Sequence, residues 1–68
     1  MYKNKLKSIR EQQGITLLKL SIISGVSIGY LCHLEKGTRN NPSREVMEKI
    51  SNALNKTVAE VFFYWKVI

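Results

Sequence analysis

Residues 16–35 of the 68-residue chain read TLLKLSIISGVSIGYLCHLE, and this segment carries the clearest structural signals in the sequence. Two short apolar segments lie on either side of Gly25-Val26-Ser27. Thr16 and Ser27 stand where a side-chain oxygen can cap the first amides of a helix. Gly25 can adopt the left-handed backbone conformation that ends many helices. Two helices joined by a three-residue turn that contains glycine are typical of a helix-turn-helix.

The remaining sequence predicts three more helices. Gly14 is a natural end for the first helix, and Ser43 can cap the fourth. Asn55 tolerates the left-handed conformation after the fourth helix, and Thr57 with Glu60 forms a capping box for the fifth. The expected helices span residues 2–13, 17–24, 28–36, 44–54 and 58 onward. We therefore expect an all-α fold in a single domain over residues 1–68.

The positive charge of the chain is concentrated in its first two thirds. Eleven Lys and Arg against five acidic residues give a formal net charge of +6 at pH 7. Residues 1–44 carry eight of the basic and only two of the acidic side chains, whereas residues 45–68 carry three of each. A concentrated basic surface is what binding to nucleic-acid phosphates requires. A basic surface without such a role is the alternative interpretation.

Residues in the turn and along the rest of the chain together match the sequence pattern of a known protein family. They are Arg10, Gly14, Thr16, Leu20, Gly25-Val26-Ser27, Leu31, Leu34-Glu35, Gly37, Pro42-Ser43, Ile50 and Ala53-Leu54. With these residues the chain resembles, over residues 4–62, the phage repressor and Cro type (XRE-like) of helix-turn-helix DNA-binding protein. The resemblance implies a compact five-helix, lambda-repressor-like domain whose third helix lies in the major groove of double-stranded DNA.

The helical spacing of residues 28–36 separates a core side from a side that would face the DNA bases. Leu31 and Leu34 point to the core side, with Tyr30 at its edge. The opposite side carries Ile28, Gly29, Cys32 and His33. Ile28 can contact a thymine methyl group and His33 can donate a hydrogen bond, but none of the four is an Arg, Asn or Gln, which make two-pronged base contacts. We therefore expect base reading through methyl contacts and DNA shape, or modest specificity.

Polar and basic side chains around the turn and after the third helix are candidates for contacts to DNA phosphates. They are Thr16, Ser27, Tyr30, Lys36, Thr38, Arg39 and Asn40. In the family that the chain resembles, the loop after the recognition helix lies along the DNA backbone. Such contacts set affinity and register rather than sequence choice. A plain solvated loop would have a similar composition.

Arg10 and Glu35 are expected to form a structural ion pair. The resemblance implies this pair, because in the family an arginine at this position commonly pairs with the glutamate that ends the third helix. A guanidinium can hold a carboxylate through two hydrogen bonds, which would fix the angle between the first and third helices.

The second helix departs from the family in two ways. Leu17 stands where the family often has a glutamine that contacts a phosphate, and leucine cannot donate that hydrogen bond. Leu18, Ile22 and Ile23 occupy positions that are usually polar and exposed. A helix that is apolar nearly all round is normally buried, so we expect a partner surface or a different packing of the C-terminal tail. Scattered surface hydrophobic residues are the alternative.

The C-terminal segment, residues 61–68, reads VFFYWKVI and carries more apolar side chains than one helix face can bury. The inward face at helical spacing comprises Val58, Val61, Phe62 and Trp65. Off that face lie Phe63, Tyr64, Val67 and Ile68. Aromatic residues are enriched at protein interfaces, so these four residues predict a homodimer interface. An amphipathic membrane anchor is less favoured, because Lys66 alone supplies positive charge nearby.

These observations predict a sequence-specific DNA-binding transcriptional regulator, most simply a repressor that occupies an operator as a homodimer. The alternative is a protein-interaction module that keeps the fold without reading bases. An enzyme is not expected, because the chain shows no carboxylate pair, phosphate-binding loop or nucleophile with its base. Neither a cofactor nor a metal is expected, since Cys32 and His33 have no second cysteine or histidine to complete a zinc site.

The expected compartment follows from cysteine usage and from the hydropathy pattern. A single cysteine allows no intramolecular disulfide, which fits a reducing compartment. The apolar run of residues 15–26 is interrupted by Lys19 and is shorter than the roughly 20 apolar residues of a membrane span. Since the N-terminus does not resemble a signal peptide either, we expect a cytoplasmic protein with no membrane partner.

Overall fold

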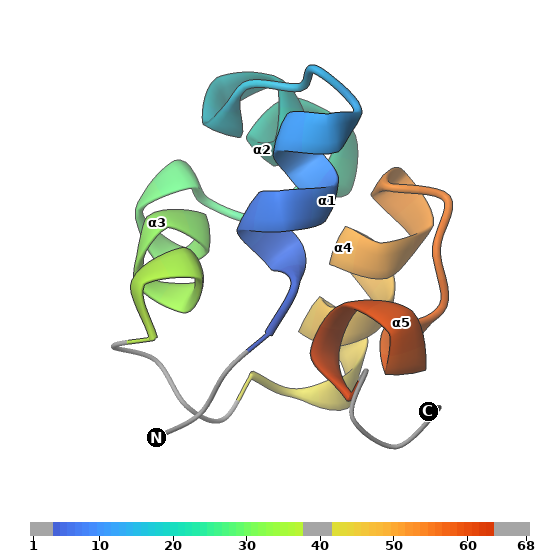
Figure 1. The fold of residues 1–68 in the computed structure, drawn as a ribbon. Coiled ribbons are helices and arrows are strands. Elements are labelled where there is room, and N and C mark those ends of the chain that lie inside the picture. Colours follow the sequence, from blue (N-terminus) through green and yellow to red (C-terminus); the bar gives the residue numbers. More distant parts are fainter. Residues whose placement is uncertain (1–3, 38–41, 64–68) are drawn as a thin grey trace.

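The computed structural model describes residues 4–37 and 42–63. Over these ranges the chain forms five helices and no strand. They are α1 (Leu6–Gln12), α2 (Leu17–Ser24), α3 (Ile28–Lys36), α4 (Arg44–Ala53) and α5 (Val58–Phe62) (Figure 1). The all-α class expected from the sequence is confirmed, and α2 and α3 are the two helices joined by the glycine-containing turn.

The first helix, α1, runs through the middle of the arrangement (Figure 1). It packs against α3 on one side and against α5 on the other. The second helix packs against both α3 and α4, and α4 also packs against α5. All five helices therefore enclose one core, whose buried hydrophobic residues are Leu6, Ile9, Leu20, Val26, Leu31, Leu34, Ile50, Leu54, Val61 and Phe62. Fully burying one such large side chain is worth about 1.5–3 kcal/mol relative to leaving it exposed.

The first helix begins later than the sequence pattern indicated. We expected it to start at Tyr2, whereas α1 starts at Leu6. The side-chain oxygen of Asn4 accepts a hydrogen bond from the Leu6 N–H at 2.9 Å, a local turn that satisfies one of the first amides of the helix. The N–H of Lys5 donates to the Val61 carbonyl at 2.8 Å, which ties this residue to α5 instead. Tyr2 itself lies outside the described residues.

The ends of α4 and α5 follow the predicted signals. The Ser43 hydroxyl accepts a hydrogen bond from the Val46 N–H at 3.2 Å where α4 starts. Thr57 and Glu60 form the expected reciprocal capping box, with hydrogen bonds of 2.9 and 3.1 Å. Asn55 has a φ of 58°, the left-handed conformation expected in the turn after α4. These residues fix the short connection that folds α5 back against α4.

The C-terminal end of the described structure corrects the expectation for Phe63. Helical spacing placed its side chain off the inward face, yet Phe63 is partly buried and packs against the core. The helix ends at Phe62, and Phe63 has non-helical backbone angles (φ −130°, ψ 36°), so helical spacing no longer predicts its direction. The other residues of the predicted homodimer interface, Tyr64, Val67 and Ile68, lie outside the described residues.

Candidate nucleic-acid interface

The turn between α2 and α3 is held by one glycine and by serine side chains. Gly25 has a φ of 77°, and its N–H donates to the Ser21 carbonyl at 2.9 Å to close α2. The Ser21 hydroxyl donates to the Val26 carbonyl at 2.7 Å, and the Val26 N–H donates to the Ser24 hydroxyl at 3.2 Å. The Val26 side chain is buried in the core. Together these contacts fix the position from which Ser27 starts α3.

The third helix is fixed at both ends and along its inward side. The Ser27 hydroxyl accepts a hydrogen bond from the Tyr30 N–H at 3.2 Å at its start. Gly37 ends the helix with a φ of 79° and donates its N–H to the Leu34 carbonyl at 3.2 Å. Leu31 and Leu34 are fully buried, as the helical spacing predicted. The opposite side of α3 is therefore turned away from the core.

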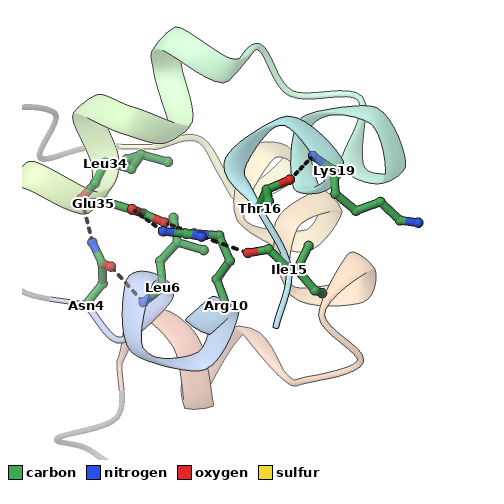
Figure 2. A network of polar contacts seen from close by, with 8 residues as sticks. All are labelled: Asn4, Leu6, Arg10, Ile15, Thr16, Lys19, Leu34 and Glu35. Atoms are coloured by element: carbon green, nitrogen blue, oxygen red, sulfur yellow. Dashed lines mark hydrogen bonds and ion pairs between the residues drawn. The ribbon is translucent and has the colours of Figure 1, made fainter. Parts of the chain in front are cut away.

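An ion pair joins α1 to the C-terminal half of α3 (Figure 2). Nε of Arg10 donates to Oε2 of Glu35 at 2.6 Å, and a second guanidinium nitrogen donates to Oε1 at 3.3 Å. A further N–H of Arg10 donates to the Ile15 carbonyl at 2.7 Å, just before α2. The two side chains are only 12% and 7% exposed, and the hydrogen bond with Glu35 raises the pKa of Arg10. The pair implied by the resemblance is thus present, and one guanidinium connects three segments of the fold.

Two amide side chains that the sequence analysis did not single out add to this support. Nδ2 of Asn4 donates to the Leu34 carbonyl at 3.0 Å, so one side chain bridges the start of α1 and the end of α3 (Figure 2). Nε2 of Gln13 donates to the Leu54 carbonyl at 2.8 Å, which ties the end of α1 to the end of α4. Asn4 carried a usable signal, because asparagine before a helical segment is a typical capping residue. Gln13 carried no such signal, because its partner is the backbone of a distant residue.

The outward side of α3 carries most of the residues predicted to face the bases. Ile28 is 46% exposed, and His33 is exposed as well. Gly29 is also exposed, and a methyl group on its Cα would meet nothing beyond its own helix within 4 Å. Cys32 is half-buried and lines a groove beside α1. The structure thus gathers Ile28, Gly29 and His33 on one exposed side and places Cys32 at its border with the groove.

The groove has a volume of about 480 Å³ and lies between α1, α2 and α3. Its lining residues are Lys7, Arg10, Glu11, Leu17, Cys32, Glu35 and Lys36. Arg10 and Glu35 neutralise each other, so the charge of the groove is set by Lys7 and Lys36 against Glu11. Leu17 adds an apolar wall without a hydrogen-bond donor. The groove therefore carries a small excess of positive charge next to the exposed side of α3.

The candidate phosphate-binding residues fall into three groups. Thr16 and Ser27 are exposed, and each hydroxyl oxygen accepts an N–H from the first turn of its helix, which leaves the hydroxyl hydrogen to donate. Tyr30 is half-buried and packs against the core, whereas Lys36 is exposed at the end of α3. The remaining candidates, Thr38, Arg39 and Asn40, lie outside the described residues.

The arrangement also bears on metal and membrane sites. Within residues 4–37 and 42–63, no three His, Cys, Asp or Glu side chains come close enough together to hold a metal ion. No single helix of the described ranges is both long and apolar enough to cross a membrane. The pair α2 and α3 matches a span only in combined length and composition, and the two helices are bent by 118° at the turn between them.

Comparison with known protein families identifies the family to which this arrangement of helices belongs. Residues 6–61 match the family described as helix-turn-helix, from the first residue of α1 into α5. The chain belongs to the helix-turn-helix family. The resemblance to the phage repressor and Cro type of this family is thereby confirmed.

Curated relatives of this helix-turn-helix chain are transcriptional regulators. It is 33% identical over 57 residues to the HTH-type transcriptional regulator SlrR of Bacillus subtilis (strain 168), which covers 84% of this chain and 38% of SlrR. It is also 33% identical over 58 residues to the HTH-type transcriptional regulator SinR of the same organism, which covers 85% of this chain and 52% of SinR. The chain therefore spans about half the length of these relatives or less.

Solved structures share the helix-turn-helix fold. A crystal structure of SinR, the master regulator for biofilm formation, in complex with DNA matches with a TM-score of 0.77 at 33% identity over 79% of this chain and 86% of that chain. A complex of the SinR and SinI proteins matches with a TM-score of 0.77 at 33% identity over 81% of this chain and 53% of that chain. The clp gene regulator ClgR from C. glutamicum gives a TM-score of 0.72 at 40% identity over 81% and 70%.

Proposed function

We propose that this chain binds double-stranded DNA through α2 and α3 and regulates transcription by occupying an operator, most simply as a repressor. The way α3 is held carries the proposal. Buried leucines, capped ends and the Arg10–Glu35 pair fix its inward side, while Ile28, Gly29 and His33 stay exposed on the other. The excess positive charge of residues 1–44 supports the proposal, because it attracts DNA phosphates. SinR, a relative of the same fold, has been solved bound to DNA.

Base reading in this proposal relies on methyl contacts and on DNA shape. Ile28 offers an aliphatic surface to a thymine methyl group, and Gly29 allows the helix backbone to approach the base pairs closely. His33 supplies a hydrogen-bonding group on the same exposed side. Contacts to phosphates by Lys36 and by residues 38–40 would supply affinity and register rather than sequence choice. Specificity at positions that the protein does not touch would come from the deformability of the DNA.

The proposal treats residues 1–68 as one DNA-binding domain that dimerises through residues 61–68. Aromatic residues, which are enriched at protein interfaces, occupy positions 62–65 of this segment and support the proposed interface. A homodimer would place two recognition helices about one DNA turn apart, roughly 10 base pairs. A monomer at high micromolar concentration in analytical ultracentrifugation would contradict this assembly. Acting on DNA in the cytoplasm, the protein would need no cofactor and would catalyse no reaction.

A protein-interaction module without base reading is the second candidate function. Two observations favour it: α2 exposes aliphatic side chains, and Leu17 presents an apolar wall where the family often has a phosphate-binding glutamine. SinR has itself been solved in a complex with another protein, SinI. The exposed side of α3 and the charge distribution favour DNA binding over this candidate.

Selection from a pool of random short DNA duplexes tests the proposed function most directly. We expect enrichment of a palindrome whose half-sites lie about 10 base pairs apart, which would reveal both base reading and a dimer on DNA. If DNA is retained in a salt-sensitive way but no sequence is enriched, the protein contacts phosphates without reading bases. That outcome would contradict the proposed sequence specificity. No retention at all would favour the interaction module.

A pair of lysine variants then tests the location of the DNA contact. Lys36→Ala should weaken binding to the selected duplex and make the slope of log affinity against log salt about 0.9 units shallower, since one phosphate contact is lost. Lys56→Ala removes the same charge from the exposed turn between α4 and α5, away from α3, and should leave that slope unchanged. A reporter gene driven through the selected operator gives the sign of regulation, and rising transcription would contradict the repressor assignment.

A further inference from the structure

The outer side of α2 is apolar and exposed. Leu18 and Ile22 are 60% and 69% exposed, and one helical turn separates them, so they lie side by side. Ile23 is 46% exposed on the same half of the helix. The inner half is filled by the fully buried Leu20 and by Ser24, which is 8% exposed. The helix cannot turn about its axis to bury these outer residues, because the same turn would expose Leu20.

Within residues 4–37 and 42–63, this exposure is confined to the helix-turn-helix. In the described ranges every exposed large hydrophobic residue lies between Leu18 and Ile28, and none lies on α1, α4 or α5. The exposed side of α4, by comparison, carries two ion pairs, Arg44–Glu48 and Glu45–Lys49. Large apolar side chains that gather on one surface mark interaction sites, whereas scattered ones do not.

A single positive charge stands in the middle of this surface. At 3.6 residues per turn, Lys19 lies between Ile22 and Ile23 around the helix axis. Figure 2 shows its side chain extending away from the helix and from the ion-pair network. No carboxylate in the part of the chain that the structure describes pairs with its ammonium group. We define Leu18, Lys19, Ile22 and Ile23 as the α2 outer face.

We propose that the α2 outer face docks an amphipathic helix of another protein, one that carries aliphatic side chains and a carboxylate facing Lys19. The aliphatic residues supply the area to be buried, and Lys19 together with the net charge of +6 selects an acidic partner. This inference goes beyond DNA binding, since it uses none of the residues proposed to contact bases or phosphates.

Two other occupants fit the α2 outer face less well. A second copy of the chain, joined through the same face by a two-fold axis, would bring Lys19 close to its symmetry mate, and the α2 outer face holds no carboxylate to pair with either lysine. An anionic lipid surface usually takes up a helix with several basic residues and aromatic anchors, but the α2 outer face offers one lysine and no aromatic ring.

Selection from a displayed library of helical peptides, each randomised on one face, tests the proposal with a defined probe. The wild-type protein should enrich peptides that combine aliphatic residues at i, i+4 spacing with Asp or Glu. Ile22→Ser should lower the affinity of the enriched peptide at least tenfold while leaving the helical circular dichroism signal and the selected DNA affinity unchanged. Leu18→Ser provides a second, independent removal of an exposed aliphatic side chain.

A charge reversal separates the proposed contact from general attraction. Selection against Lys19→Glu should enrich peptides with Lys or Arg in place of the acidic residue, whereas Lys56→Glu, with the same change of charge elsewhere, should still enrich acidic peptides. The proposal is overturned if no peptide is enriched or if the enriched peptides bind Ile22→Ser equally well. It is also overturned if Ile22→Ser abolishes self-association of the chain or its binding to phosphatidylserine vesicles, because the occupant would then be a second copy or a lipid surface.

Discussion

The two sides of α3 differ in their contacts: the inward side is held by buried leucines, an ion pair and hydrogen bonds, whereas the outward side carries few polar groups. On the inward side, Arg10 holds Glu35 and Asn4 holds the end of the helix, while buried leucines fill the core. On the outward side lie Ile28 and Gly29 with His33, none of which makes the two-pronged base contacts of Arg, Asn or Gln. The inward side fixes where the helix lies, and in the proposed function the outward side determines how well the helix discriminates between bases. Mutations can therefore change positioning and reading separately.

Removal of the Arg10 guanidinium should have the largest effect of any change to the inward side. Arg10→Ala leaves the Glu35 carboxylate, only 7% exposed, without its partner and frees the Ile15 carbonyl. Breaking a fully buried pair from one side costs about 3–5 kcal/mol, and this largely buried pair beside the groove should cost close to the lower figure. A domain of this size has a free energy of unfolding of about 5 kcal/mol, so we expect most of its stability to be lost. Urea unfolding followed by circular dichroism measures the change.

Two further variants show whether burial causes this effect. Arg44→Ala breaks the Arg44–Glu48 pair, whose side chains are 87% and 50% exposed, and should change the free energy of unfolding by less than about 1 kcal/mol. Replacing both partners, in Arg10→Met with Glu35→Leu, should recover much of the stability that Arg10→Ala loses, because no buried charge is left unpaired. Equal losses in Arg10→Ala and Arg44→Ala would contradict the buried pair as the main support of α3.

A substitution at Gly29 can change DNA base reading without changing how α3 is held in the fold. Gly29→Ala adds a methyl group that meets nothing beyond its own helix and should stabilise the protein by about 0.5–1 kcal/mol. If the backbone approaches the base pairs here, affinity for the selected operator should fall at the same time. Gly25→Ala is the matched control, because at a φ of 77° the same methyl group should destabilise the protein by about 1–2 kcal/mol. Gly29→Ala with unchanged operator affinity would place the bases elsewhere.

Local signals made much of this fold predictable. The bounds of α2 and α3 follow from residues that act within one turn of their own position, namely Thr16 and Ser27 as caps and Gly25 and Gly37 as ends. Such signals are short-range hydrogen bonds and backbone preferences, so one sequence displays them directly. The start of α1 was missed because the Asn4 side chain and a backbone contact to α5 compete there with helical spacing.

Long-range contacts made the rest harder to predict. The contact of Gln13 with the Leu54 carbonyl joins residues that no local pattern connects, whereas the Arg10–Glu35 pair was expected only from the resemblance. Phe63 was misplaced because helical spacing was extended one residue past the end of α5. For the candidate site, spacing separated the two sides of α3 correctly but did not show that Cys32 lines the groove with residues of α1 and α2.

A smaller effect is expected at Ser51, a buried residue of α4. Its side chain is 1% exposed, and among the described residues its hydroxyl has no hydrogen-bond partner. An unsatisfied buried hydroxyl is costly, so Ser51→Ala should raise the free energy of unfolding by about 0.5 kcal/mol or more. Ser8→Ala, at an exposed position of α1, gains only helix propensity and should give a smaller increase. A gain at Ser51 no larger than that at Ser8 would show that the buried hydroxyl carries no penalty.

The smallest effect should appear in the pH dependence of the Thr57–Glu60 capping box, far from α3. The Thr57 N–H donates to the Glu60 carboxylate at 2.9 Å and lowers the pKa of Glu60. The unfolded chain then binds the proton more readily, so this stabilisation is complete above the ordinary glutamate pKa of about 4.3 and is lost as pH falls through the lowered folded value. Glu60→Gln should remove that acid-dependent loss. Thr57→Ala should retain most of it, because the backbone hydrogen bond is the main cause of the shift. Urea midpoints measured from pH 7 to pH 3 distinguish these outcomes.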